Sequence, residues 1–226
     1  MNIAIVIPIR INSKRLPNKI FKKIKKETIF SILMKRLTFL KKRYTLIVAT
    51  SQKKRDEKVV NACLKNNISF YRGSLNNVLK RFIDLAEFFK LDYIIRINGD
   101  SPLIDYRIIL QLSKYIKKKN RYDLITNIFP RTYPVGQSVE IIYTKSLKKI
   151  YKKTSSYDKE HITSFFYKNS NKFKIKNISN SLDYSHVKMA IDERKDFLKL
   201  KKIYKIYPEI FNYRLKKLSL LFDEKN

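Results

Sequence analysis

Four cations lie within ten residues of one another near the start of the chain. The stretch IPIRINSKRLPNKIF covers residues 7–21, follows an apolar run, and carries the polar residues Arg10, Ser13, Lys14, Arg15 and Lys19. Cations and backbone amides at the end of a buried strand commonly bind phosphate groups. The stretch lacks the glycines and the GKS or GKT ending of a Walker-type loop. A solvent-exposed basic loop is the alternative.

Two carboxylates follow apolar runs in different halves of the chain. Asp100 comes after the run 92–97, within IIRINGDSPLID, and Asp192 ends the run 186–192. Mg²⁺ keeps several waters and takes one or two protein carboxylates when it bridges nucleotide phosphates. Both residues are therefore candidate metal ligands. The alternative is structural: Asp100 would cap the next turn, and Asp192 would cap a helix that begins at Glu193.

Two smaller polar clusters complete the set. Arg72, Gly73 and Ser74 follow the third predicted strand, within YRGSLNNVLKRF. The stretch DKEHIT carries His161, one of only two histidines in the chain. A polar residue on an exposed helix face explains His161 equally well. Neither cluster specifies a reaction by itself.

Strands and helices must alternate along the first 126 residues to position these side chains. Apolar runs with little alternation predict strands buried on both faces, over 2–9, 44–50, 68–71, 92–97 and 122–126. Apolar residues at helical spacing lie between them, the first set after a capping Thr28. This order predicts an α/β fold: one three-layer α/β/α domain with a mostly parallel, Rossmann-like sheet, in which ligands bind where strands end.

The second half of the chain is less regular. Residues 129–143 contain two prolines and a glycine before an alternating strand. The pattern predicts two further strands and three helices, over 173–179 and 186–192 and over 157–168, about 193–207 and about 212–222. No repeat or low-complexity linker separates the halves, so we expect the second half to extend the same sheet.

The chain is strongly basic, with 51 Lys and Arg against 19 Asp and Glu and a formal net charge of +32. The lysines are spread over every predicted helix, and the chain has only 3 glycines. This distribution favours a compositional bias at exposed positions over a designed basic patch. A nucleic-acid-binding protein is the alternative. We expect no nucleic-acid partner, because neither a helix-turn-helix pattern nor an RNA-binding aromatic motif is present.

Cysteine content and hydropathy give two further expectations. The single cysteine, Cys63, excludes an internal disulfide, and its place in a predicted helix indicates a buried, inert thiol. The start MNIAIVIPIR has no basic segment and no cleavage site, and no stretch reaches the length of a membrane span. We therefore expect a cytoplasmic protein that has no membrane partner.

Six stretches, in this order, resemble motifs of the cytidylyltransferases that activate acidic sugars. The stretches are IPIRINSKRLPNK, RGSLNNVLKRF, GDSPLID, YPVGQSVE, EHIT and IDERKDF, spread from about residue 3 to residue 200. The resemblance is to the CMP-ketodeoxyoctonate and CMP-acylneuraminate synthetases, and most closely to the spore coat polysaccharide biosynthesis protein F group. It implies a fold of the nucleotide-diphospho-sugar transferase type.

The resemblance also implies a reaction. CMP would be transferred from CTP to an acidic sugar of the ulosonic acid type, with Mg²⁺ as cofactor and release of pyrophosphate, for surface polysaccharide biosynthesis. The sugar's anomeric hydroxyl would attack the α-phosphorus. Positioned cations would stabilise the leaving pyrophosphate, without a covalent intermediate. The partners would be CTP, the acidic sugar and a second copy of the chain in a homodimer.

Site residues follow from the same resemblance. The catalytic cations would be Arg10, Arg15 and Lys19. The nucleotide would be bound by these and by Ser13, Lys14, Arg72, Gly73, Ser74 and Asn98. The sugar would meet Tyr133, Glu140, Glu160 and His161, and Mg²⁺ would be held by Asp100 and Asp192. Within the single domain 1–226, about 1–127 would form the nucleotide-binding half and about 128–226 the sugar-binding and dimerisation half.

Three positions depart from the family pattern. Asn18 replaces the usual glycine of the first motif, and Asn is the best non-glycine residue at positive φ. Asn77 and Ser138 each replace an aspartate. The two lost carboxylates bear on base and sugar contacts more than on phosphate chemistry. They favour one further alternative, a nucleotide-binding protein without catalysis, and the sugar itself is not specified by the sequence.

Overall fold

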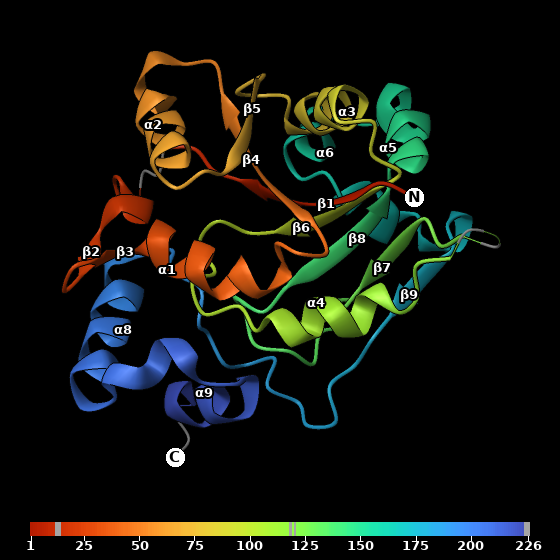
Figure 1. Ribbon diagram of the computed structural model, residues 1–226. Coiled ribbons are helices and arrows are strands. Elements are labelled where there is room, and N and C mark those ends of the chain that lie inside the picture. The colour runs from red at the N-terminus through yellow and green to blue at the C-terminus, as the bar shows by residue number, and fades with distance from the viewer. Residues whose placement is uncertain (12–14, 118, 120, 224–226) are drawn as a thin grey trace.

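A computed structural model describes residues 1–11, 15–117, 119 and 121–223 (Figure 1). In these residues seven strands form one mixed sheet, in the spatial order β5-β4-β1-β6-β8-β7-β9. The strands are β1 (Ile3–Pro8), β4 (Thr45–Ser51), β5 (Ser69–Gly73), β6 (Tyr93–Ile97), β7 (Leu124–Thr126), β8 (Val139–Tyr143) and β9 (Ile175–Asn177). The one sheet runs through both halves of the chain, as predicted.

The direction of the strands determines where the sheet can bind a ligand. Strands β5, β4, β1 and β6 are parallel, so their carboxyl ends meet at one edge. Strand β8 is antiparallel to β6 and to β7, and β9 is parallel to β7. In the antiparallel pair β6–β8, Arg96 lies opposite Glu140. The predicted mostly parallel sheet is confirmed.

Helices cover both faces of the sheet, which explains why β1 has almost no polar residue. Ile5 and Ile7 pack under α1 (Ile29–Leu37), α2 (Glu57–Lys65) and α4 (Tyr106–Ser113). The residues that alternate with them along β1 pack under α3 (Val78–Phe88), α5 (Thr144–Ile150) and α7 (Ser164–Lys168). Figure 1 shows α3 and α5 above the sheet and α1 and α4 below it. Each fully buried isoleucine contributes about 1.5–3 kcal/mol to folding.

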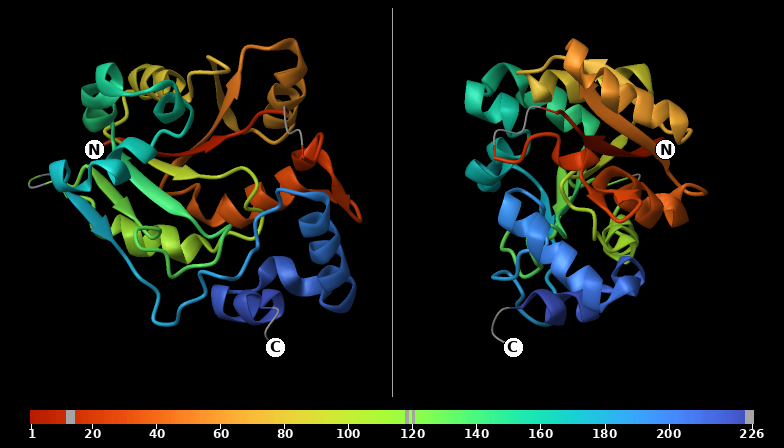
Figure 2. Two further views of the ribbon diagram at one scale, coloured as in Figure 1. Left: turned by 180° about the vertical axis from the view of Figure 1, so that it is seen from behind. Right: turned by 90° about the vertical axis from the view of Figure 1, so that its left-hand side faces the viewer.

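A third apolar cluster joins the basic loop to the C-terminal part of the chain. Leu16 packs there with Ile24 of the hairpin β2 (Lys23–Ile24) and β3 (Glu27–Thr28), and with Met189. Helices α8 (Arg194–Ile206) and α9 (Leu215–Phe222) close the cluster. Both views of Figure 2 show α8 and α9 together at the lower end of the molecule. This packing brings segments that lie about 170 residues apart in sequence to the same edge of the sheet.

The strand predicted over 186–192 is wrong. This segment makes only an isolated bridge, between Lys188 and Val135, among the residues that the structure describes. Its alternate residues Val187, Met189 and Ile191 are buried in the third cluster. An extended chain buried on one side has the alternating pattern of a strand, but no neighbouring strand is available here to form a ladder.

The single helix predicted over 157–168 is two short helices, α6 (Ser156–Glu160) and α7. The Asp158 carboxylate belongs to a capping box at the start of α6 and also accepts a hydrogen bond from Ser164 Oγ, at 2.7 Å. It therefore holds the starts of both helices together. The break leaves Glu160 at the end of α6, where the chain turns.

Two local predictions, for Thr28 and for Cys63, are confirmed. Thr28 caps α1, and its hydroxyl accepts from the backbone N–H of Ser31 at 3.0 Å. Cys63 is buried, and burial raises the pKa of its thiol to about 12, so the thiol is inert. The cap of α4 is Asp105, not Asp100. No helix within the described residues is long and apolar enough to cross a membrane.

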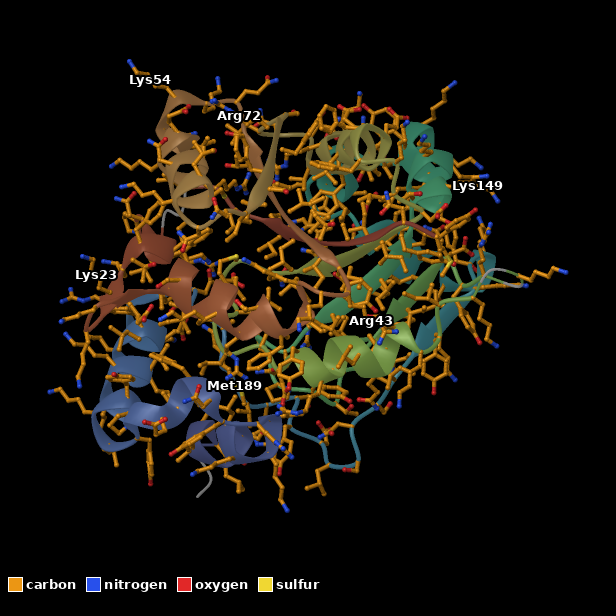
Figure 3. The ribbon with its side chains drawn as sticks, in the orientation of Figure 1. Lys23, Arg43, Lys54, Arg72, Lys149 and Met189 are labelled. Carbon is orange, nitrogen blue, oxygen red and sulfur yellow. The ribbon has the colours of Figure 1, made fainter. Side chains whose placement is uncertain are left out.

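The positive charge is distributed over the surface. Figure 3 shows the cationic ends of Lys23, Lys54 and Lys149 at the periphery of the molecule, and they come from three different elements. Such side chains keep their charged groups in water and bury only part of their aliphatic stems. This distribution agrees with a compositional bias at exposed positions.

Asn18 has the left-handed backbone expected where the family has glycine, with φ 52° and ψ 29°. We expect Asn18→Gly to leave the free energy of unfolding nearly unchanged and Asn18→Val to lower it by about 1–2 kcal/mol, because a β-branched residue is strained at positive φ. Urea denaturation of the three proteins measures the difference. A valine variant as stable as the glycine variant would contradict this expectation.

Candidate active site

A polar pocket of about 420 Å³ opens at the carboxyl ends of β1 and β6. Eight residues predicted from sequence line it: Arg10, Arg15, Lys19, Asn98, Asp100, Glu160, His161 and Asp192. Two further arginines line it that were not predicted as site residues, Arg81 and Arg96. Ser13 and Lys14 lie outside the described residues. The pocket thus collects polar residues from both halves of the chain.

Lys19 lies between the two predicted metal ligands. Its Nζ donates to Asp100 Oδ2 at 3.0 Å and to Asp192 Oδ1 at 3.4 Å. Arg15 forms a second ion pair with Asp192. The two carboxylates come from opposite halves of the chain, and here they converge on one ammonium group. Asp192 is not a helix cap, so the structural alternative for this residue is wrong.

A close approach of two chain segments explains the glycine at position 99. A Cβ atom there would lie 3.0 Å from the carbonyl oxygen of Pro8 and 2.8 Å from Cγ1 of Ile9. Real Cβ atoms essentially never approach another atom to 2.8 Å, and a contact of 3.0 Å is tighter than most, so a side chain here would force its neighbours to move. Gly99 therefore lets the ends of β1 and β6 come together, which places Asp100 beside the basic loop.

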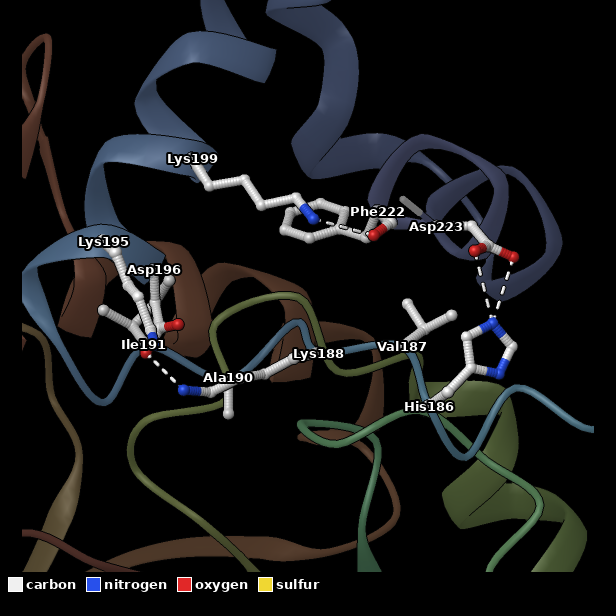
Figure 4. Close-up of a pocket in the computed structure, with 10 residues that line it drawn as sticks. All are labelled: His186, Val187, Lys188, Ala190, Ile191, Lys195, Asp196, Lys199, Phe222 and Asp223. Atoms are coloured by element: carbon white, nitrogen blue, oxygen red, sulfur yellow. Dashed lines mark hydrogen bonds and ion pairs between the residues drawn. The ribbon is translucent and has the colours of Figure 1, made fainter. Parts of the chain in front are cut away.

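Asp192 is held by Asp196, a residue that the sequence analysis did not single out. Asp196 Oδ2 accepts from the backbone N–H groups of Asp192 and Glu193, at 2.9 and 2.7 Å, and from Lys188 Nζ at 2.8 Å. Figure 4 shows Asp196 and Lys188 in a neighbouring pocket of about 610 Å³. Asp196 also completes a capping box with Glu193 at the start of α8. The spacing of a capping box was the available sequence signal.

We expect Asp196→Asn to reduce activity about tenfold through the misplacement of Asp192. Burial raises the pKa of Asp196, but the bonds from Lys188 and from the two backbone N–H groups outweigh it, so the pKa is lowered overall. A lowered pKa stabilises the fold above the ordinary aspartate pKa of about 3.9, and this stabilisation is lost as pH falls further. The stability difference between wild type and variant should therefore be constant near pH 7 and shrink below about pH 4. Urea denaturation across pH tests this, and a pH-independent difference would contradict it.

Arg10 and Glu160 form an ion pair at the mouth of the pocket, 2.6 Å from Nη2 to Oε1. The hydrogen bond from Arg10 lowers the pKa of Glu160. Both side chains are partly exposed, at 35% and 47%. Such a pair contributes little to stability, so a phosphate can compete for Arg10. His161 follows directly and packs against Tyr157, with ring centroids 4.5 Å apart and ring planes tilted by 38°.

Glu140, predicted to meet the sugar, is only 1% exposed and does not line the pocket. It forms an ion pair with Arg96 across the β6–β8 ladder. It also accepts from the Tyr167 hydroxyl at 2.6 Å, and this hydroxyl lies 3.0 Å from Thr126 Oγ1. Burial and then the charge of Glu140 raise the pKa of Tyr167. Arg96 is therefore the member of this chain of bonds that faces the pocket.

Tyr133 and the RGS stretch lie outside this pocket. The ring of Tyr133 is buried, and its hydroxyl donates to Gln111 Oε1 at 3.2 Å. Arg72, Gly73 and Ser74 line a separate pocket of about 560 Å³ at the end of β5. Arg72 forms an ion pair with Glu57 at 2.9 Å. The structure does not bring these predicted residues to the paired carboxylates.

Structural contacts account for the two replaced aspartates. Asn77 caps α3, and its Oδ1 accepts from the Lys80 backbone N–H at 2.8 Å, a role that Asn and Asp perform equally well. Ser138 is buried, and its hydroxyl accepts from Arg131 Nη2 at 3.1 Å. Neither residue lines the pocket. The replacements therefore leave the paired carboxylates and the basic loop intact.

The donor set fits Mg²⁺. Two aspartate carboxylates converge on one position, and Mg²⁺ takes one or two such ligands together with waters and phosphate oxygens. No group of three or more His, Cys, Asp or Glu in the described residues could hold a metal ion. An ion at Asp100 and Asp192 would therefore need substrate oxygens and waters to complete its coordination.

These features define an α/β protein of the nucleotide-binding class, with cations and paired carboxylates where parallel strands end. The chain belongs to the cytidylyltransferase family, whose model matches residues 4–225. It is therefore a nucleotidyltransferase, as the sequence predicted. The resemblance noted from its six motifs is confirmed.

The chain is also similar to individual proteins and to a solved structure. The chain is 34% identical to the uncharacterized protein MJ1063 of Methanocaldococcus jannaschii, over 87% of this chain and 81% of that protein. It is 26% identical to the spore coat polysaccharide biosynthesis protein SpsF of Bacillus subtilis, over 90% of this chain and 86% of that protein. The structure of a cytidylyltransferase from Leptospira borgpetersenii superposes with a TM-score of 0.89 at 30% identity, covering 100% of this chain and 98% of that one.

Proposed function

We propose that the protein transfers CMP from CTP to an acidic sugar of the ulosonic acid type, with Mg²⁺ and with release of pyrophosphate. One observation supports this most strongly: Lys19 lies between Asp100 and Asp192, beside the cations Arg10 and Arg15. Cations bind a triphosphate, and paired carboxylates bind the metal that accompanies it. Both kinds of ligand are within one pocket.

The cations would act on the triphosphate. In the reaction, the sugar's anomeric oxygen forms a bond to the α-phosphorus, and the bond from this phosphorus to the pyrophosphate oxygen breaks. Arg10, Arg15 and Lys19 would bind the β- and γ-phosphates and stabilise the charge that grows on the leaving group. Asp100 and Asp192 would hold Mg²⁺, which neutralises phosphate oxygens when bound. The half-exposed pair of Arg10 with Glu160 can open at little cost, which frees Arg10 for the phosphate.

Arg96 would bind the carboxylate of the sugar. The Arg96 guanidinium is held by its ion pair with Glu140, which in turn accepts from the Tyr167 hydroxyl. A guanidinium matches a carboxylate in geometry. Glu160 and His161, which also line the pocket, would meet the sugar hydroxyls.

The nucleotide would lie mainly against residues 1–127 and the sugar mainly against 128–226. We further propose a homodimer that works in the cytoplasm, where CTP is available, and supplies surface polysaccharide biosynthesis.

A pyrophosphate-release screen tests the proposed function. Each of the four nucleoside triphosphates would be combined with ketodeoxyoctonate, N-acetylneuraminate and matched neutral sugars, with and without Mg²⁺. We expect release only with CTP, an acidic sugar and Mg²⁺. Binding of CTP without release across the panel would favour a non-catalytic nucleotide-binding protein. Nucleic-acid affinity that falls steeply with salt and is independent of CTP would favour the other alternative.

A further inference from the structure

Arg81 is a buried cation that forms no ion pair with the residues that the structure describes. It belongs to α3 and is only 1% exposed. Its Nη1 donates to the carbonyl oxygen of Ser74 at 3.0 Å, whereas its Nε has no hydrogen-bond partner. In the part of the chain that the structure describes, Arg81 makes no ion pair with a carboxylate. Burial of a guanidinium in this way is costly, so we looked for a ligand that would compensate the charge.

The position of Arg81 shows where such a ligand would bind. Its side chain lines the same pocket as Arg10 and the paired carboxylates. Burial and then the like charge of Arg10 lower the pKa of Arg81 to about 10, while Asp56 opposes the change. Asp56 is itself buried and already accepts from the Ile11 backbone N–H, at 2.8 Å, and from Ser51. Two cations whose charges affect each other thus line the pocket, and the nearby carboxylate accepts hydrogen bonds from other groups.

The chain makes room for Arg81 at a specific glycine. A Cβ atom on Gly73 would lie 2.7 Å from Cγ of Arg81. Gly73 and Arg81 belong to one motif, YRGSLNNVLKRF, so the motif contains both the cation and the space for its stem. Any side chain at position 73 would therefore force the stem of Arg81 to shift.

Another buried arginine shows what a purely structural role looks like. Arg36 is 8% exposed, and each of its guanidinium nitrogens donates to a backbone carbonyl. Those carbonyls belong to Ile104, Phe211 and Tyr213, at 2.7, 2.6 and 3.1 Å. Burial likewise lowers the pKa of Arg36 to about 10. Arg36 joins three segments of the chain, whereas among the described residues Arg81 makes a single hydrogen bond, to the exposed residue Ser74.

We propose that Arg81 is a further nucleotide-binding residue, whose guanidinium donates to a phosphate oxygen of a triphosphate bound beside Arg10. An anion is the ligand that compensates a buried, unpaired cation, and a phosphate oxygen accepts strongly from a guanidinium. The inference rests on the proposed function only in that the pocket binds a nucleoside triphosphate, and it requires no particular sugar.

Stability without ligand gives the first test. Arg81→Met removes a buried, unpaired charge and leaves the exposed Ser74 carbonyl to water, so we expect a melting temperature equal to or above that of the wild type. Arg36→Met removes three hydrogen bonds to carbonyls, so we expect a lower melting temperature. If Arg81→Met lowers the melting temperature as much as Arg36→Met does, Arg81 has a structural role and the proposal is wrong.

Affinity gives the second test, by calorimetry with CTP, inorganic tripolyphosphate and cytidine. We expect Arg81→Met to weaken CTP and tripolyphosphate about 10- to 100-fold, the loss of a charge-assisted hydrogen bond, and to leave cytidine unchanged. Lys80→Met is the matched control, because it removes one exposed charge from the same helix and should change none of the three affinities.

The remaining outcomes separate this inference from the proposed function. Weaker cytidine binding with unchanged tripolyphosphate binding would mean that Arg81 contacts the base, and would overturn the proposal. Equal losses in Arg81→Met and Lys80→Met would show a general effect of net charge, and would overturn it too. If the wild type binds CTP but releases no pyrophosphate with any sugar, the proposed function fails, while the phosphate role of Arg81 is still supported by its affinities.

Discussion

Replacement of Asp100 by alanine is expected to lower pyrophosphate release by about 1,000-fold or more. Asp100 is one of two carboxylates that converge on Lys19, and Asp192 is the other. Loss of either removes one of the two protein ligands proposed for Mg²⁺, and with it the neutralisation of phosphate charge. The measurement is the rate of pyrophosphate release with saturating CTP, the acidic sugar found in the screen and a Mg²⁺ titration.

Glu87→Ala is a suitable control for this experiment. Glu87 pairs with Lys148 on the surface of α3 and does not line the pocket. We expect this variant to keep its activity, since exposed pairs contribute little. Urea denaturation should show that Asp100→Ala is folded. Full activity of a folded Asp100→Ala protein would rule out Asp100 as a metal ligand.

Replacement of Lys19 by methionine is expected to lower pyrophosphate release about 100- to 1,000-fold, because a cation that stabilises the leaving group is removed. The effect on stability should depend on the metal. Without Lys19, Asp100 and Asp192 repel each other, so the free protein should melt at a lower temperature. Added Mg²⁺ should then raise the melting temperature of Lys19→Met more than that of the wild type.

Lys35→Met provides the matched control for Lys19→Met. Lys35 pairs with one carboxylate, Glu27, and lies outside the pocket. Its loss should leave both the activity and the response to Mg²⁺ unchanged. If Mg²⁺ stabilises Lys19→Met no more than Lys35→Met, the two aspartates do not form a metal site. The rates and the melting curves are independent, so either result can be interpreted without the other.

The predicted fold was most accurate where local pattern and tertiary environment agree. The strands β1, β4 and β6 are buried on both faces, and their long apolar runs indicate this directly. The segment 186–192 has the alternation of a strand, but its apolar side faces α8 and its backbone pairs with no full strand among the described residues. Pairing depends on neighbours that are distant in sequence, so the local pattern alone predicted a strand here.

The sequence motifs led to part of the candidate site. Asp100 and Lys19 belong to ordered motifs and lie together as expected. Glu140 also belongs to a motif, yet it lies behind Arg96, because the register of β6 against β8 places the two residues opposite each other. Glu140 holds Arg96, and Asp196 holds Asp192. These roles depend on which backbone and side-chain groups surround the two residues, and motif spacing does not contain that information.

The sequence by itself determined the class of the protein, because periodic burial predicts strands and helices and six ordered motifs identify a cytidylyltransferase. The resemblance also indicated a left-handed position at residue 18, where the family has glycine, and Asn18 adopts it. Only the tertiary structure decided which charges are paired. It brought Asp192 to Asp100 across the third apolar cluster, and it left Arg81 buried with no ion pair among the described residues. The physical reason is that charge pairing and desolvation depend on distances between segments, and chain packing sets those distances.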